Sequence, residues 1–115
     1  MKARIYHNPS CSKSRAALTL LEARGVELEV VDYLNDPPSK AALASLLDKL
    51  GVPAQALVRA TDQELTTLLA GGARTADRVL DLLVQQPSLL QRPIVETGHH
   101  ARIGRPPERV LELFE

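Results

Sequence analysis

The sequence predicts an α/β fold built on a four-stranded mixed sheet, and three observations support this. Residues 3–6 are a short, β-compatible apolar run, followed by a helical pattern of alanine and leucine and then by a β-branched run at 28–33. A long helical stretch fills about residues 39–90. Two more strand-like runs, at 93–97 and 101–104, precede a closing helix.

The first three elements form one strand, helix, strand unit. The Asn8-Pro9-Ser10 run breaks the first strand, and the helix that follows ends near Gly25. A connection of this length between strands is a crossover, which is almost always right-handed. We therefore expect the first two strands to be parallel.

The middle of the chain is predicted to be a helical lobe of the same domain. Ser39 is a suitable N-cap, and Thr61 with Glu64 has the spacing of a capping box. The breaks between helices are short, and no repeat or low-complexity linker is visible. We predict a single domain over residues 1–115, with the helical lobe at about 39–90.

The carboxy-terminal part predicts a hairpin and a closing helix. Gly98-His99-His100 joins the two short strands, with both histidines expected at the surface, and Pro107 suits the first turn of a helix. The complete order of elements matches the thioredoxin-like plan, in which a reactive cysteine follows the first strand and a proline precedes the third. A fold of this kind does not itself define a function.

Charge and hydropathy exclude several classes of function. Acidic and basic residues balance at 14 each, so no net field favours a nucleic acid or a membrane. No stretch approaches the ~20 apolar residues of a membrane span, and the amino terminus lacks the apolar core of a signal peptide. We expect a cytoplasmic protein.

The single cysteine cannot form an internal disulfide, so any redox partner is external.

Cys11 is predicted to be a reactive thiol at the start of the first helix. Free backbone N–H groups and the helix dipole stabilise a thiolate there, and Lys13 and Arg15 add positive charge. Cys11 and Ser14 form a Cys-x-x-Ser motif, whose hydroxyl can donate to a thiolate but cannot resolve a disulfide. His7 is near enough in sequence to favour the thiolate. The competing interpretation is a buried, inert cysteine, which the polar neighbours disfavour.

Three arginines, Arg59, Arg92 and Arg105, are candidates for binding an oxyanion. Planar guanidinium groups offer paired N–H donors that suit tetrahedral anions. Arg92 and Arg105 each precede a proline, which restricts their backbone and makes the bond a candidate cis peptide. The sequence leaves the state of Arg92-Pro93 open. His99 and His100, with one distant cysteine, have no metal-site spacing, so no metal site is predicted.

Five blocks of the sequence resemble the glutaredoxin-linked arsenate reductases. The blocks are Ile5-Tyr6-His7-Asn8-Pro9-x-Cys11-x-x-Ser14-Arg15, Tyr33-Leu34-x-x-Pro37-Pro38, Ala56-Leu57-x-Arg59, Arg92-Pro93-Ile94-Val95 and Arg102-x-x-Arg105-Pro106. They occur in order from Ile5 to about Leu113. The chain stops at Glu115, where longer members continue, so it is most similar to the short members of the family.

The resemblance implies an enzyme that reduces arsenate to arsenite. Cys11 would attack arsenate and His7 would favour its thiolate. The oxyanion would be held by Arg59, Arg92 and Arg105, a pocket that would also admit phosphate or sulfate. Supporting residues would be Asn8, Ser14, Arg15 and Pro93. Glutathione and a glutaredoxin would act as external reductants, with no metal or bound organic cofactor.

Two other functions stay open. A glutathione-dependent thiol-disulfide oxidoreductase would use the Cys-x-x-Ser motif without the arginines. A non-enzymatic redox regulator that binds RNA polymerase is a further alternative, although Ser14 replaces the second cysteine that such switches often use. The single cysteine argues against the unrelated phosphatase-like arsenate reductases. Those enzymes need several cysteines and a Cys-x5-Arg loop, whereas Arg15 lies only four positions after Cys11.

Overall fold

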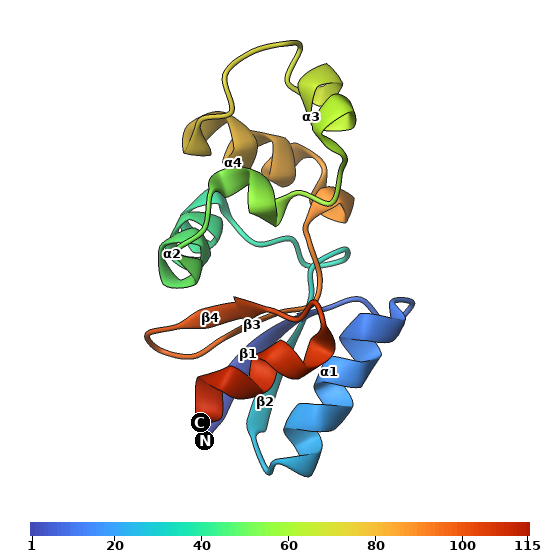
Figure 1. Cartoon of the computed structure of the whole chain (residues 1–115), viewed down its shortest axis with the longest axis vertical. Helices are drawn as coiled ribbons and strands as arrows, with labels where there is room; N and C mark the ends of the chain where they lie inside the picture. Colours follow the sequence, from blue (N-terminus) through green and yellow to red (C-terminus); the bar gives the residue numbers. More distant parts are fainter. The chain divides into compact units, whose positions relative to one another are not determined.

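The computed structural model describes residues 1–115 and divides into two compact units, which Figure 1 traces in sequence colours. The first unit joins Met1–Asp36 to Arg92–Glu115, and the second is Pro37–Gln91. That the two units unfold together, as the single domain expected from the sequence, stays a prediction. One heat-capacity peak in calorimetry would support it, and two separate peaks would contradict it.

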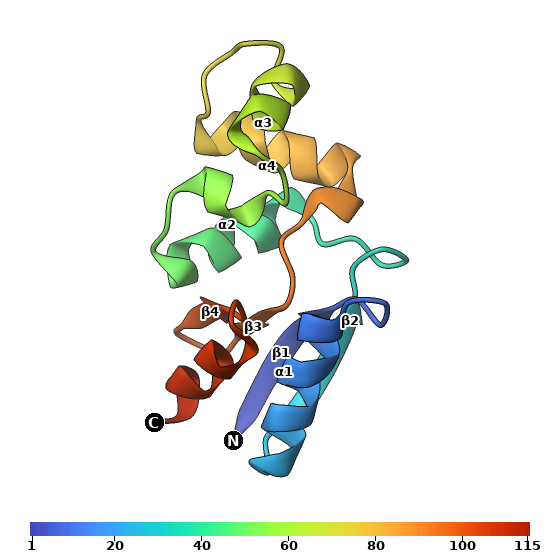
Figure 2. The same ribbon diagram turned by 45° about the vertical axis from the view of Figure 1, so that its right-hand side comes forward.

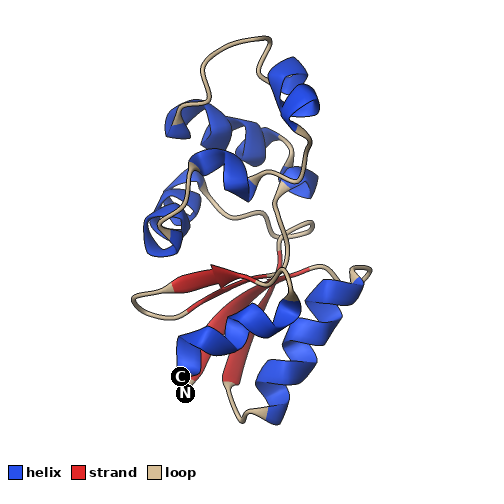
Figure 3. Cartoon of the chain, viewed as in Figure 1, coloured by secondary structure: helices blue, strands red, loops and turns tan.

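A four-stranded mixed sheet forms the frame of the first unit (Figure 3). Its strands are β1 (Lys2–His7), β2 (Glu27–Asp32), β3 (Ile94–Glu96) and β4 (Ala101–Ile103), in the order β2-β1-β3-β4. β1 is parallel to β2 and antiparallel to β3, and β3 is antiparallel to β4. The predicted mixed sheet, the parallel first pair and the final hairpin are therefore confirmed.

One face of this sheet carries the core of the first unit. The helix α1 (Ser12–Ala23) lies along β1 and β2 in Figure 2, and the closing 3-10 helix η3 (Pro107–Phe114) packs beside α1. The core is built from small and branched apolar side chains of both helices and of the strands. Its buried members are Ala3, Ile5, Ala17, Leu21, Val26, Val95 and Val110.

A polar network on the opposite face joins three adjacent strands. The buried Glu96 on β3 accepts hydrogen bonds from the Tyr6 hydroxyl at 2.7 Å and from Arg4 Nη1 at 3.1 Å, both on β1. Arg4 Nε also donates to Glu29 on β2 at 3.0 Å. Burial, together with the neighbouring carboxylate, raises the pKa of Tyr6 to about 12. The network satisfies a buried carboxylate, which would otherwise destabilise the sheet.

Gly104, just after β4, allows the chain to pass close to Pro93. Its N–H donates to the Pro93 carbonyl oxygen at 2.8 Å. A Cβ atom at Gly104 would lie 2.6 Å from Pro93 Cγ and 3.1 Å from Val110 Cγ1. Pro93 is fully buried, so it has little room to move away.

Gly104→Ala is therefore expected to lower the free energy of unfolding by about 1–3 kcal/mol, because the added methyl group overpacks a buried contact. Urea denaturation of the two proteins measures the difference. Gly98→Ala is the matched control, since a Cβ there meets no atom within 4 Å and the residue has no positive φ. Equal effects of the two substitutions would contradict the packing argument.

The second unit is helical, as predicted. It contains α2 (Lys40–Leu50), α3 (Asp62–Leu68) and α4 (Ala76–Gln85), with short 3-10 helices η1 (Ala54–Leu57) and η2 (Pro87–Leu89). No helix of the chain is long and apolar enough to cross a membrane.

Side-chain caps and ion pairs hold these helices. The Ser39 hydroxyl accepts from the Ala42 N–H, and Thr61 and Glu64 form both bonds of a capping box, so the two predicted caps are confirmed. Lys40 on α2 pairs with Asp81 on α4 at 2.9 Å. Local capping therefore defines the helix starts, and ion pairing connects α2 to α4 within this unit.

Candidate functional site

A tight turn between β1 and α1 positions Cys11 at the N-cap of the helix. Its backbone is extended, its N–H donates to the Asn8 carbonyl oxygen at 3.0 Å, and its carbonyl accepts from the Arg15 N–H at 3.0 Å. The Asn8 side chain accepts from the Ser10 N–H at 2.9 Å, which stabilises the turn. The thiol therefore lies where the free N–H groups of the first helical turn converge.

The surroundings of Cys11 favour the thiolate. Burial raises the pKa of the thiol, but hydrogen bonds from the Ser14 N–H, from the Arg92 guanidinium and from the Lys13 N–H outweigh it and lower the pKa below its ordinary value. Cys11 is partly exposed, so the sulfur is open to a reactant. A low pKa and partial exposure together are typical of a nucleophilic cysteine.

Two arginines from the carboxy-terminal part of the first unit meet at this sulfur. Arg92 precedes β3 and donates to the Cys11 sulfur, and Arg105 follows β4, with its Nη2 4.0 Å from the same atom. Arg105 Nε also donates to the Arg92 carbonyl oxygen at 2.9 Å, which connects the two segments. Both Arg92-Pro93 and Arg105-Pro106 are cis. The site therefore combines a thiolate, two guanidinium groups and a helix N-terminus.

His7 and Ser14 form a buried pair beneath the turn. His7 Nδ1 lies 2.6 Å from Ser14 Oγ, which also accepts from the Asn8 N–H at 3.0 Å. Burial lowers the pKa of His7; Asp32 opposes this shift and Arg15 adds to it. Burial therefore disfavours the positively charged form of the His7 imidazole.

The sequence motif suggested the Ser14 hydroxyl as a donor to the thiolate, but a different group of Ser14 contacts the sulfur. The group of Ser14 that reaches the Cys11 sulfur is its backbone N–H, while its hydroxyl contacts His7 and Asn8. The reason is helix geometry: N–H groups of the first turn point along the axis to the N-cap, whereas a buried side chain leans back toward the preceding strand. His7 and the Ser14 hydroxyl thus hold the turn, and through it the thiol.

Ser14→Ala is expected to lower the free energy of unfolding by about 1–3 kcal/mol, because it leaves the Asn8 N–H and His7 Nδ1 without their buried partner. Urea denaturation measures the change. Ser12→Ala is the matched control on the same helical turn, because Ser12 is exposed. A loss for Ser12→Ala as large as for Ser14→Ala would contradict a specific role of the buried pair.

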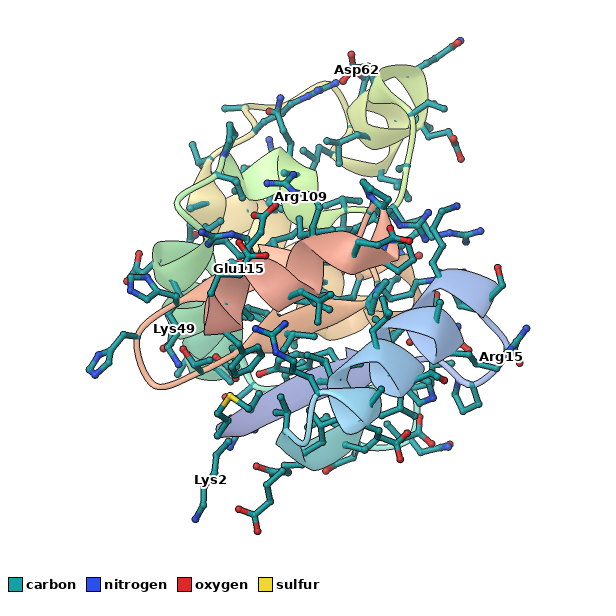
Figure 4. The ribbon with its side chains drawn as sticks, turned by 60° about the horizontal axis from the view of Figure 1, so that its bottom comes forward. Lys2, Arg15, Lys49, Asp62, Arg109 and Glu115 are labelled. Atoms are coloured by element: carbon teal, nitrogen blue, oxygen red, sulfur yellow. The ribbon has the colours of Figure 1, made fainter.

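The other predicted site residues lie around this centre or in the second unit. Arg15 is exposed near the start of α1 (Figure 4), and its Nη1 donates to the Pro9 carbonyl oxygen at 2.8 Å. Pro93 lies at the entry to β3, packed against Gly104. Arg59 is an exposed residue of the second unit. The first unit therefore brings Cys11 together with two of the three predicted arginines, and a role for Arg59 stays a prediction.

Sequence reasoning missed two supporting residues. Asp32, which acts on the pKa of His7, is its partner in the parallel register of β1 and β2. Extending the predicted pairing of the two strands to their last residues could have found it. No sequence pattern pointed to Gly104. A glycine is required there because the chain passes close to Pro93, which is eleven positions away along the sequence.

The comparisons with known proteins agree with this architecture. The fold is thioredoxin-like, and its site holds one partly exposed cysteine and no second one. Residues 6–113 match the model of the ArsC family. The chain belongs to the ArsC family.

Several relatives match over almost their whole length. A Neisseria meningitidis arsenate reductase is 43% identical, with 93% of each chain covered. The uncharacterized protein YfgD of Escherichia coli K12 is 46% identical, covering 97% of this chain and 96% of the relative. Among solved structures, an arsenate reductase from Vibrio cholerae has a TM-score of 0.88 at 40% identity, with 97% of both chains covered. The chain thus resembles relatives of about its own length.

Proposed function

We propose that this protein is an arsenate reductase that takes its electrons from glutathione and a glutaredoxin. The observation that carries the proposal is the Cys11 sulfur, held at a helix N-terminus and contacted by Arg92 and Arg105. Relatives at about 40% identity are named arsenate reductases, which supports the same substrate here. Arsenate is a tetrahedral oxyanion that fits such a set of donors.

In the first proposed step the Cys11 thiolate attacks arsenic. A sulfur–arsenic bond forms, and one arsenate oxygen takes two protons and leaves as water. Arg92, Arg105 and the first-turn N–H groups of α1 stabilise the negative charge on the remaining oxygens. No oxidation state changes in this step, so arsenic is still As(V).

The reduction follows from two external thiols, because the chain has no second cysteine. Glutathione attacks the bound arsenic, and a second oxygen leaves as water with the thiol proton and one proton already on the adduct. A glutaredoxin thiol then attacks the glutathione sulfur, forming a mixed disulfide and leaving an electron pair on arsenic, which becomes As(III). Water releases arsenite and restores the Cys11 thiolate.

The remaining sequence assignments belong to the same proposal. Arg59 contributes to oxyanion binding, and Asn8, Ser14 and Arg15 hold the turn that carries the thiol. The partners are arsenate, glutathione and a glutaredoxin, with no bound cofactor. These reductants are thiols of the cytoplasm, so a cytoplasmic location is part of the proposal.

An omission series tests the proposal. The protein is mixed with arsenate, glutathione, glutaredoxin, glutathione reductase and NADPH, and arsenite is measured together with the loss of NADPH absorbance. We expect one NADPH consumed for each arsenite formed, and no arsenite when arsenate or either thiol is left out. NADPH oxidation that requires a disulfide and ignores arsenate would instead support a thiol-disulfide oxidoreductase.

A further inference from the structure

Four of the fourteen basic residues of this neutral chain lie around Cys11. Fourteen acidic residues balance fourteen basic ones, yet the first turn of α1 contains no acidic residue. Lys13 and Arg15 lie in the first turns of α1. Arg92 and Arg105 reach the sulfur from the carboxy-terminal segment of the first unit. A negatively charged reactant therefore meets a local attractive field at this one place.

Three of these four cations already have partners in the first unit. Arg92 donates to the sulfur, Arg105 donates to the Arg92 carbonyl oxygen, and Arg15 donates to the Pro9 carbonyl oxygen. Lys13 differs from them, because it is exposed and its ammonium group makes no ion pair. It is therefore the cation that remains available to a molecule arriving from solvent.

The position of Lys13 in α1 directs its side chain toward the turn that carries the thiol. It is the second residue of α1, and its backbone N–H donates to the Cys11 sulfur. Side chains in a helix lean toward the N-terminus, so the Lys13 side chain leans toward the turn that carries the thiol. Two carboxylates lie at the end of β2 and in the turn that follows it. Asp32 accepts a hydrogen bond from the Asn35 side chain at 2.7 Å, and the Asp36 N–H donates to the Asp32 carbonyl oxygen at 2.7 Å.

We infer that Lys13 is the docking cation for an anionic thiol reductant, which is glutathione in the proposed function on which this inference rests. Glutathione carries two carboxylates and one ammonium group, so its net charge is negative. Once an oxyanion occupies Arg92 and Arg105, Lys13 is the remaining cation for an incoming carboxylate. Contact with it brings the glutathione sulfur toward the arsenic atom bound to Cys11. The arginines thus select the oxyanion, and Lys13 selects the reductant.

A disulfide-exchange experiment tests this without any arsenate chemistry. The Cys11 thiolate attacks one sulfur of an aromatic disulfide, forms a mixed disulfide and releases one coloured thiolate. The dianionic probe is 5,5′-dithiobis(2-nitrobenzoate), and the uncharged probe is 4,4′-dithiodipyridine. Rates are compared at low ionic strength and corrected for the measured Cys11 pKa. Two unit charges about 4 Å apart in water attract by about 1 kcal/mol, which is roughly a fivefold effect on rate.

We expect Lys13→Gln to slow the reaction of Cys11 with the dianionic probe roughly fivefold and to leave the rate with the uncharged probe unchanged. The difference between the two probes should disappear in high salt. Lys13→Arg should restore the wild-type rate. The matched control is Lys2→Gln, an exposed lysine at the other end of β1. Equal rates of Lys13→Gln and wild type with the dianionic probe would overturn the inference, as would an equal slowing of both probes.

The same variants separate this inference from the proposed function. In the coupled arsenate assay, Lys13→Gln should raise the KM for glutathione severalfold and raise the KM for arsenate less, because Arg92 and Arg105 contact the oxyanion directly. When both carboxylates of glutathione are esterified, its KM should be the same for Lys13→Gln and wild type. If wild type reduces no arsenate but the disulfide probes still distinguish Lys13→Gln, the proposed function fails and the docking role stands.

Discussion

Cys11→Ser is expected to abolish arsenate reduction while leaving the protein as stable as the wild type, or more stable, at a pH below the folded pKa of Cys11, where the wild-type thiol is neutral. The hydroxyl of serine does not ionise near neutral pH, so the nucleophile is lost, with an expected fall in kcat on the order of 10⁶, below any background. The cysteine side chain makes no capping hydrogen bond at the start of α1, whereas serine is a preferred N-cap and adds about 0.5–1 kcal/mol.

Activity and stability should therefore change independently. The coupled assay measures arsenite formation, and thermal unfolding measures Tm on the same samples. A Cys11→Ser protein that is folded and still forms arsenite at the wild-type rate would contradict the role of Cys11. A large fall in Tm would instead contradict the capping argument and show that the thiol is needed for the fold.

Arg92→Ala is expected to reduce kcat/KM for arsenate by roughly 10²–10³-fold and to raise the pKa of Cys11. The guanidinium donates to the sulfur and favours its charged form, so its removal shifts the pH profile of alkylation by iodoacetamide to higher pH. The loss in kcat/KM is the size expected when one donor to a developing oxyanion is removed. Arg92→Lys keeps the charge but loses the planar pair of donors, so an intermediate rate is expected.

The same contact has a consequence for stability. The folded pKa of Cys11 lies below its unfolded value of about 8.5. The thiolate therefore stabilises the fold above that pH, and this contribution is lost as the pH falls through the folded pKa. In Arg92→Ala this pH dependence should be weaker. Arg109→Ala, at an exposed arginine of η3, is the control and should change neither the alkylation profile nor kcat/KM. An unchanged Cys11 pKa in Arg92→Ala would contradict the contact.

Much of the fold could be predicted because its signals are local. Ser39 and the Thr61–Glu64 pair define helix starts through hydrogen bonds to residues three positions away. The crossover between β1 and β2 follows from the length of the connection and the chirality of the chain. The position of Cys11 at a helix start is likewise visible in the break at Pro9 and the apolar pattern that follows it.

The chemistry at the sulfur depended on contacts over long distances in the chain. Arg105 lies 94 residues after Cys11, and the register of β1, β3 and β4 brings these residues together. The sequence suggested Arg105 through its neighbouring proline and the family resemblance, but not its bond to the Arg92 carbonyl oxygen. Side-chain direction within the first turn of α1 decided that the Ser14 hydroxyl binds His7, while its N–H reaches the thiol.

The sequence by itself therefore determined the thioredoxin-like fold, the helix caps and the position of the single cysteine at the start of α1, because periodicity, capping and chain chirality act between near neighbours. The tertiary structure decided which groups surround that cysteine. Sheet register and helix direction place two arginines and two backbone N–H groups on one sulfur. Such convergence depends on the whole packed unit, and no local pattern encodes it.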